Sequence, residues 1–266
     1  MKIGLSRVGW RDMDSSTTIR GTSHTGGRVM SVRDFTVEQA AALAPGDHHY
    51  RAFVGPTYRY DLIGAQQFGL LYLLGLRETH RLLDFGCGSL RLGRLAIPYL
   101  LKGRYFGIDP EAWLVDDGFD RELGRDALAL KEPRFDHNAD YRADVFGTAF
   151  DYIIAQSIFS HTGEAASRRA LTAFKGSLAP GGLIVVNWMV GPEAEPFHPD
   201  TSEWVYPGCV TFSPERIERI AAEAGLAVRP CPWWHPGLNW YVLAHSEAEL
   251  PDSGFLASLA LQPLSR

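Results

Sequence analysis

The sequence predicts a doubly wound α/β fold, with a mostly parallel seven-stranded sheet that ends in an antiparallel hairpin. From residue 80 onward, short apolar runs alternate with longer helical stretches, which is typical of a parallel sheet covered on both faces by helices. The last two strands are joined by only seven residues, PWWHPGL (232–238), and a parallel crossover needs about a dozen. A helical N-terminal extension precedes this core.

Two helices are expected in the N-terminal extension, over 31–79. Thr36 and Gln39 have the spacing of a capping box at the start of a short helix over 36–44. A turn-like stretch rich in Tyr, His, Gly and Pro follows it. The Leu-rich run DLIGAQQFGLLYLLGL (61–76) then predicts a largely buried helix, because the run is too long for a typical strand.

Seven apolar runs of strand length define the core, over 80–250. They cover residues 81–85, 105–109, 134–138, 150–156, 183–190, 226–231 and 239–245. Helices are expected between them, over 90–101, 111–130, 163–178 and 213–225. The last of these starts with a capping residue, Ser213, and a proline at the first helical position, and it ends at Gly225. A long loop (191–212) precedes it. The chain ends, 1–30 and 251–266, are expected to be tails outside a single domain.

Composition and charge argue against several classes of function. The net charge is −5 and the isoelectric point about 6.0, whereas a nucleic-acid binder usually carries a strongly basic face. The three cysteines form no CxxC pair, so we expect neither a disulfide framework nor a metal site, and a reducing cytoplasm fits best. No apolar run approaches the ~18 residues of a membrane span. We therefore expect a cytoplasmic protein that binds neither nucleic acid nor membrane; its oligomeric state stays open.

The sharpest feature is the glycine turn in RLLDFGCGSLRLGR (81–94). A buried strand leads through Asp84 into Gly86 and Gly88, and glycine allows a positive φ and a close approach of ligand to backbone. The next strand ends in Asp109, 21 residues beyond Gly88, where a carboxylate can accept hydrogen bonds from two ribose hydroxyls. Together these features predict a ligand that contains a nucleoside. The alternative is an ordinary strand–turn–helix unit with a capping acid.

The residues around the turn argue against a dinucleotide as the ligand. A dinucleotide fingerprint requires a third glycine, and Arg91 stands at that position. A carboxylate at Asp84 would repel a pyrophosphate, but it suits a ligand that carries an ammonium group. S-adenosylmethionine has such a group, with ribose and adenine at its other end.

Four motifs in this order resemble those of the Rossmann-like (class I) S-adenosylmethionine-dependent methyltransferases. LLDFGCGS resembles the first motif, FGIDP the second, FDYIIAQSIFSHT the fourth, and LAPGGLIVV the turn into the fifth strand. They span Arg81 to Val186, and the closing hairpin extends the resemblance to about His245. The chain departs from the family pattern at Leu90, where the family often has another glycine.

The resemblance implies that S-adenosylmethionine is the cofactor and that the turn holds it. Asp84 would orient the methionine ammonium group, directly or through water, and Asp109 would hold the ribose hydroxyls. The backbone along the cofactor would be that of Phe85, Gly86, Cys87 and Gly88.

Three further residues follow from the resemblance, two of them with loose spacing, and Arg91 is an unusual residue beside the turn. Asp140 would contact the adenine amino group while Tyr141 stacks on the ring, although Asp140 is alternatively a surface acid. Gln156 would line the methyl-transfer channel through its main chain. Arg91 would pair with the carboxylate of the cofactor or with an anionic substrate, or it is a solvated helix residue.

The candidate general base is His161, in SIFSHT. Related small-molecule enzymes place a histidine there, and an ordinary histidine pKa of about 6.5 suits the role. The alternative is a structural histidine that caps the next helix. His198 and His235 are weaker candidates.

A small organic acceptor, aromatic or sugar-like, is expected to receive the methyl group on oxygen or nitrogen. Aromatic residues gather in the two segments that would frame the substrate mouth, and we name Tyr58, Tyr60, Trp204 and Tyr206 as substrate residues. The segment Gln156–Phe159 lacks the Pro-Pro-Tyr/Phe run of enzymes that methylate nucleobase amines. Three alternatives remain: a binding module without turnover, methylation of a macromolecule, and a nicotinamide-dependent oxidoreductase.

Overall fold

The computed structural model describes residues 31–202 and 204–260. The tail predicted over 1–30 and the last six residues lie outside the described residues. Within the part described, no helix is long and apolar enough to cross a membrane.

The central sheet confirms the predicted fold class. It consists of β1 (Leu82–Phe85), β2 (Tyr105–Ile108), β3 (Arg134–Asp136), β4 (Phe150–Ala155), β5 (Leu178–Val190), β7 (Ala227–Cys231) and β8 (Asn239–Ala244). Their order is β3-β2-β1-β4-β5-β8-β7. The first five strands are parallel, and β8 lies antiparallel between β5 and β7, as the short connection required. An eighth, unpredicted strand, β6 (Thr211–Phe212), pairs with β5 inside the long loop.

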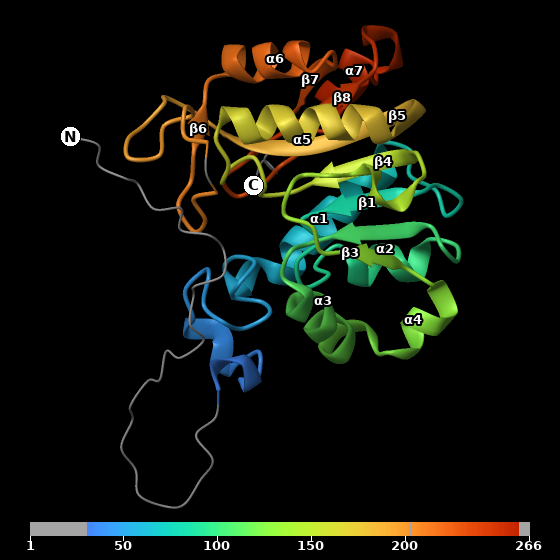
Figure 1. The fold of residues 1–266 in the computed structure, drawn as a ribbon, viewed down its shortest axis with the longest axis vertical. Coiled ribbons are helices and arrows are strands. Elements are labelled where there is room, and N and C mark those ends of the chain that lie inside the picture. The colour runs from blue at the N-terminus through green and yellow to red at the C-terminus, as the bar shows by residue number, and fades with distance from the viewer. Residues whose placement is uncertain (1–30, 203, 261–266) are drawn as a thin grey trace, which may run out of the picture.

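Helices cover both faces of this sheet (Figure 1). The α-helices are α1 (Tyr60–Leu73), α2 (Gly93–Tyr99), α3 (Ala112–Gly118), α4 (Asp126–Lys131), α5 (Glu164–Ser177), α6 (Pro214–Glu223) and α7 (Ser253–Ser258). One apolar layer joins α1, α2 and α7 to the sheet, and the other joins α5 and α6 to it. Part of the segment assigned to a C-terminal tail thus packs on the core, since Leu256 of α7 is buried.

Several helices are shorter than predicted. The capping box of Thr36 and Gln39 forms, with both reciprocal hydrogen bonds at 2.8 and 3.3 Å, but it starts only the 3₁₀ turn η2 (Gln39–Ala42). The helix predicted over 111–130 is divided into α3, the π-helical turn η4 (Phe119–Leu123) and α4. Gly124, with φ of 85°, makes the break.

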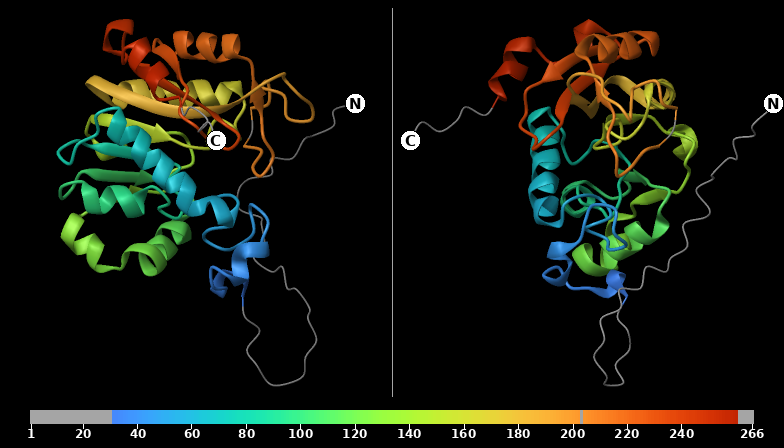
Figure 2. Two further views of the ribbon diagram at one scale, coloured as in Figure 1. Left: turned by 180° about the vertical axis from the view of Figure 1, so that it is seen from behind. Right: turned by 90° about the vertical axis from the view of Figure 1, so that its left-hand side faces the viewer.

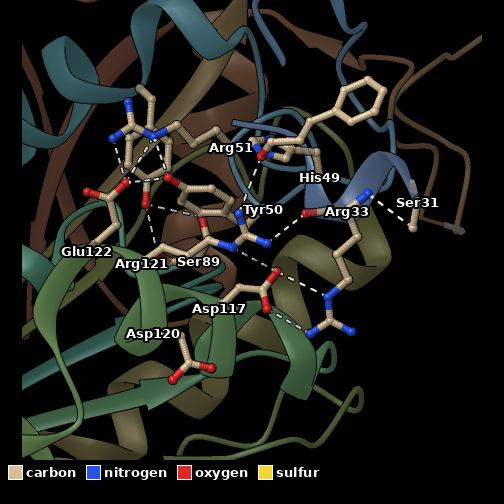
Figure 3. Close-up of polar contacts among 12 residues, drawn as sticks. Ser31, Arg33, His49, Tyr50, Arg51, Ser89, Asp117, Asp120, Arg121 and Glu122 are labelled. Atoms are coloured by element: carbon tan, nitrogen blue, oxygen red, sulfur yellow. Dashed lines mark hydrogen bonds and ion pairs between the residues drawn. The ribbon is translucent and has the colours of Figure 1, made fainter. Parts of the chain in front are cut away.

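The N-terminal extension is fastened to α3 and η4 by charged side chains (Figure 3). Arg33 pairs with Asp117 at 2.7 Å, and Glu122 accepts hydrogen bonds from Arg51 and from Tyr50, the latter at 2.8 Å. The side chains of both acids are only 8 % exposed, so these pairs are largely withdrawn from solvent screening. The extension therefore stands at a defined position beside the carboxyl end of β2.

Candidate active site

A cavity of about 420 Å³ opens where β1, β2 and β4 end. The chain runs outward from β1 to β3 on one side and from β4 to β5 on the other, so the boundary of β1 and β4 is the topological switch point where ligands bind in such sheets. The N-terminal extension and the loop 191–212 lie at this same end of the sheet (Figures 1 and 2). Both supply walls of the cavity, and the turn between β7 and β8 supplies another.

The glycine turn forms despite its departure from the family pattern. Gly86 and Gly88 have φ of 76° and 51°, and Leu90 adopts a left-handed φ of 61°. This conformation costs a leucine roughly 1–2 kcal/mol. The Leu90 side chain is fully buried in the layer of α1 and α2, which contributes more than that cost. The turn delays the start of α2 to Gly93, three residues later than predicted.

Apolar side chains occupy the room above both glycines. A Cβ on Gly86 would overlap the Ile158 side chain, and one on Gly88 would approach Val54 to within 2.7 Å. Glycine is therefore required here by packing as well as by φ. Cys87 points away from the cavity and is buried behind the turn, where it faces Gly107 of β2.

Asp109 lies on the cavity wall and is bound to the glycine turn. Its Oδ2 accepts the Gly88 amide at 2.8 Å and its Oδ1 accepts the Glu111 amide at 2.9 Å. Burial raises the pKa of this carboxyl to about 6, although both amides favour the charged form. Each oxygen retains a lone pair for a hydroxyl donor.

Asp84 lies beneath the turn, outside the set of described residues that line the cavity. It is 3 % exposed, and its Oδ2 accepts a hydrogen bond from the hydroxyl of Tyr105 at 2.6 Å. Burial raises the pKa of Asp84 to about 7, while the nearby charge of Arg91 acts in the opposite direction. The ionised form of this buried acid is therefore costly unless a cation approaches it.

The predicted adenine contacts are only partly brought together. Asp140 is exposed and does not line the cavity, although its neighbours Ala139 and Tyr141 do. The surface-acid alternative therefore describes its position. Tyr141 has a positive φ of 64° and does line the cavity, stacked on Phe85 with ring centroids 6.3 Å apart. Asn138, which the sequence analysis missed, lies on the wall beside it.

Arg91 is not a solvated helix residue. It lines the cavity, donates from Nη1 to the carbonyl of Val54 at 2.9 Å, and donates from Nη2 to Oε1 of Gln156. Gln156 is buried and exposes part of its side chain to the same cavity, where Gln67 also donates to its Oε1 at 3.2 Å. The side chain of Gln156 is thus engaged in contacts, whereas we predicted a role for its main chain.

His161 lines the cavity and does not cap a helix. The cap of α5 is Gly163, without a side-chain hydrogen bond. Nδ1 of His161 lies 2.6 Å from the carbonyl oxygen of Gly208, which can only accept, so Nδ1 carries the proton. Nε2 is therefore the nitrogen with the free lone pair. Burial lowers the pKa of His161, which keeps the ring neutral at physiological pH.

Two of the four predicted substrate residues line the cavity. Trp204 and Tyr206 stand beside the His161 ring, with centroids 5.6 and 4.8 Å away. Tyr60 is fully buried and donates to the carbonyl of Ser89 at 2.8 Å, whereas Tyr58 is 74 % exposed. The turn that leads into α1 points these two tyrosines inward and outward, and Arg59 between them lines the cavity.

The remaining candidates divide clearly. His235 lines the cavity, and its Nε2 lies 3.3 Å from Nε2 of Gln156. His198 pairs with Glu193 at 2.9 Å and lies outside the cavity. Arg59, Ser160 and Cys209 also line the cavity and were not predicted. Arg59 and Cys209 belong to no motif, and Ser160 lies in the fourth motif beside His161, which was named instead. Among residues 31–202 and 204–260, no cluster of ligands for a metal ion occurs.

Comparisons with known proteins agree with this geometry. Residues 83–184 match the family model described as a methyltransferase domain, which confirms the resemblance predicted from the motifs. The fold is similar to magnesium protoporphyrin IX methyltransferase from Synechocystis PCC 6803 with bound S-adenosylmethionine, at 14 % identity and a TM-score of 0.51, over 70 % of this chain and 82 % of that one.

Two further structures show the same fold. A glycopeptide N-methyltransferase complexed with S-adenosylmethionine is 12 % identical with a TM-score of 0.52, over 69 % of this chain and 94 % of that one. An S-adenosylmethionine-dependent methyltransferase from Clostridium acetobutylicum ATCC 824 is 13 % identical, also with a TM-score of 0.52, over 69 % and 91 % of the two chains.

Proposed function

We propose that this chain, which carries a methyltransferase domain, binds S-adenosylmethionine at the glycine turn and methylates an oxygen or nitrogen of a small organic acceptor. One observation carries the proposal. The Asp109 carboxylate meets the turn Gly86–Gly88 on the wall of a cavity, at the switch point of a sheet whose final strand pair is antiparallel. The acid, the turn and the other residues that line the cavity come from separate parts of the chain.

The residues present fit this cofactor. The Asp109 carboxylate keeps two lone pairs for the ribose hydroxyls. Phe85, Tyr141 and Asn138 form the adjoining wall and suit the adenine ring and its polar edge. Asp84, beneath the turn, would interact with the ammonium group at close range or through a water, as the raised pKa of an unpaired buried acid favours a cationic partner.

When bound, S-adenosylmethionine supplies a methyl group on a sulfonium, which departs as a neutral sulfide. The protein's own contribution is alignment and the exclusion of water. Alignment alone lowers such barriers by about 7–11 kcal/mol in favourable cases. Trp204 and Tyr206 close one wall, and the hydroxyl of Tyr206 donates to the Phe53 carbonyl at 2.6 Å, which joins the loop 191–212 to the N-terminal extension.

His161 is the proposed proton acceptor. Its Nδ1 proton is committed to the carbonyl of Gly208, so Nε2 accepts the proton that a hydroxyl or ammonium acceptor loses. The Gly208 carbonyl then stabilises the charged ring, since it remains an acceptor for the Nδ1 proton. A base of this kind contributes about 10²–10⁴-fold to the rate.

Calorimetric titration with S-adenosylmethionine and S-adenosylhomocysteine tests the proposal. We expect both to bind, and Asp109→Ala to weaken them about 10- to 100-fold through loss of charged hydrogen bonds. Asp140→Ala is the matched control and should bind as the wild type does, since Asp140 is exposed and outside the cavity. Thermal unfolding of each variant checks that it is folded. Failure of the wild type to bind either molecule would overturn the proposal.

Transfer of a radiolabelled methyl group to small-molecule and macromolecular fractions of a cell extract separates the alternatives. Label in the small-molecule fraction supports the proposal, and label in protein or nucleic acid assigns a macromolecular acceptor. Binding without transfer to any fraction indicates a module without turnover. A spectral change of added NADH would instead indicate an oxidoreductase.

A further inference from the structure

We propose that the acceptor is an anion, a small molecule with a carboxylate or phosphate group held by Arg59 and Arg91. The inference rests on the proposed function, because it names the substrate class for the same site. It begins from the uneven distribution of charged side chains along the cavity.

Acids and bases line different parts of the cavity. Among the described residues, its carboxylates are Asp109 and Glu111, which lie together after β2, where the ribose is expected. The arginines and histidines of the wall come from other segments of the chain. We call this part the acceptor end; it comprises Arg59, Arg91, Gln156, His161, Tyr206 and His235.

Contacts join the residues of the acceptor end. Arg91 donates to Gln156, whose amide nitrogen is 3.3 Å from Nε2 of His235. The ring of His161 lies 4.8 Å from that of Tyr206, and the charge of Arg91 acts on Tyr206 as well. Arg91 therefore stands between the glycine turn and the residues beside the candidate base.

Arg91 is a cation without a carboxylate partner among the described residues. Both of its hydrogen-bond acceptors, the Val54 carbonyl and the Gln156 amide oxygen, are neutral. A guanidinium has five N–H donors and stays protonated, so most of its donors remain available. Asp84, buried beneath the turn, interacts with this charge but forms no ion pair with Arg91. Burial lowers the pKa of Arg91, which shows that its charge is desolvated in this position. An anion in the cavity would compensate that cost.

Arg59 adds a second unpaired charge. It lines the cavity, and within the part of the chain that the structure describes its guanidinium makes neither an ion pair nor a hydrogen bond; it only approaches the ring of Tyr58 at 5.2 Å. By contrast, Arg33, Arg51 and Arg94 of the neighbouring network all have carboxylate partners. Of these five described arginines, only the two on the cavity wall are without a carboxylate partner.

The pKa of His235 is affected by the charges of both arginines. Its pKa is lowered to about 4, first by burial and then by the charges of Arg91 and Arg59. The carboxylate of S-adenosylmethionine brings one negative charge and can pair with Arg91, which directly follows the glycine turn. Since its own ammonium group offsets that charge, the acceptor end stays positive after the cofactor binds. An anionic acceptor would neutralise the remainder, and two guanidinium groups offer the forked donors that carboxylates and phosphates prefer.

The test uses the complex of the full chain with S-adenosylhomocysteine, which fills the cofactor's own carboxylate position. Ligand-observed NMR measures the binding of benzoate and phenyl phosphate to this complex, each compared with neutral benzamide. We expect at least one anion to bind at least tenfold more tightly than benzamide. Arg59→Gln should remove that preference and leave the affinity for S-adenosylhomocysteine within twofold. Arg125→Gln, at an exposed arginine that does not line the cavity, is the control.

The outcomes separate this inference from the proposed function. No binding of S-adenosylhomocysteine overturns the proposed function itself. If it binds but neither anion is preferred over benzamide, the anionic acceptor is refuted. A tenfold loss of S-adenosylhomocysteine affinity in Arg59→Gln, with the anion preference intact, would assign Arg59 to the cofactor and also refute the inference. Preference for benzoate or for phenyl phosphate distinguishes a carboxylate acceptor from a phosphorylated one. Arg91→Lys, which keeps the charge but loses the fork, should weaken the preferred anion less than Arg59→Gln does.

Discussion

Replacement of Asp84 by asparagine should stabilise the ligand-free protein at neutral and alkaline pH. The carboxyl is 3 % exposed, and burial raises its pKa from 3.8 to about 7. Folding therefore strengthens proton binding at this site. A group of this kind destabilises the fold as pH rises, because ionisation in the folded state is more costly than in the unfolded chain.

The magnitude follows from the pKa shift. At 1.36 kcal/mol per unit, the shift amounts to about 4 kcal/mol once the pH exceeds the folded pKa, and to none below the unfolded pKa. Between pH 5 and 8 the wild type should lose about 3 kcal/mol of unfolding free energy through this one group. The asparagine side chain cannot ionise, and its oxygen can still accept the hydroxyl of Tyr105. Any constant cost of the substitution, such as an unpaired amide, does not change with pH.

Urea unfolding followed by tryptophan fluorescence measures this difference at pH 5, 6, 7 and 8. Between pH 5 and 8, the unfolding free energy of Asp84→Asn should rise relative to that of the wild type by about 3 kcal/mol. Asp140→Asn, at an exposed acid outside the cavity, should show a gap that hardly changes. If the difference in unfolding free energy between Asp84→Asn and wild type does not change with pH, the conclusion that burial raises the pKa of Asp84 is refuted. The variant should also lose affinity for S-adenosylmethionine, since stability and binding conflict at such a site.

Three further predictions follow from the contacts. Nitrogen NMR of His161 should show a neutral ring protonated on Nδ1 at pH 7. Its titration midpoint should lie below 6.5, because burial lowers the pKa. A ring protonated on Nε2 would contradict the proposed base. Leu90→Gly should lower the unfolding free energy by about 2–4 kcal/mol in urea unfolding. The loss of a fully buried side chain outweighs the relief of the left-handed φ. A more stable variant would show instead that the backbone strain dominates. Glu122→Gln should cost about 3–5 kcal/mol by removing the buried carboxylate from Arg51, which keeps only its pair with the exposed Asp61. Limited proteolysis should then cut the N-terminal extension faster, and unchanged cleavage would separate the extension from this ion pair.

The succession of strands along the chain, the antiparallel final pair and the meeting of the glycine turn with Asp109 were predictable from local patterns. Most strands are apolar runs, and the seven-residue link before β8 excluded a parallel crossover, so chain geometry alone determined the antiparallel pair. The glycines and Asp109 were recognisable because the carboxyl ends of neighbouring parallel strands meet at one edge. Their predicted proximity is confirmed by the hydrogen bond from the Gly88 amide to Asp109.

Positions that depend on loops could not be predicted in this way. Tyr58 and Tyr60 belong to the same sequence pattern, yet the turn before α1 exposes one, buries the other and places Arg59 on the cavity wall. Asp140, named on loose family spacing, lies outside the cavity, while Asn138 lines it. In such segments the side-chain direction follows from backbone turns that no hydrophobic period encodes.

The sequence by itself determined the fold class, the glycine turn and the acid beside it, because periodicity and short-range turn chemistry are local properties. Only the tertiary structure decided which charges remain unpaired and which histidine nitrogen is free. Arg91 meets Val54 and Gln156, and His161 meets Gly208, across 37, 65 and 47 residues of chain. The electrostatic character of a site depends on such distant partners and on desolvation, and both exist only after the chain has folded.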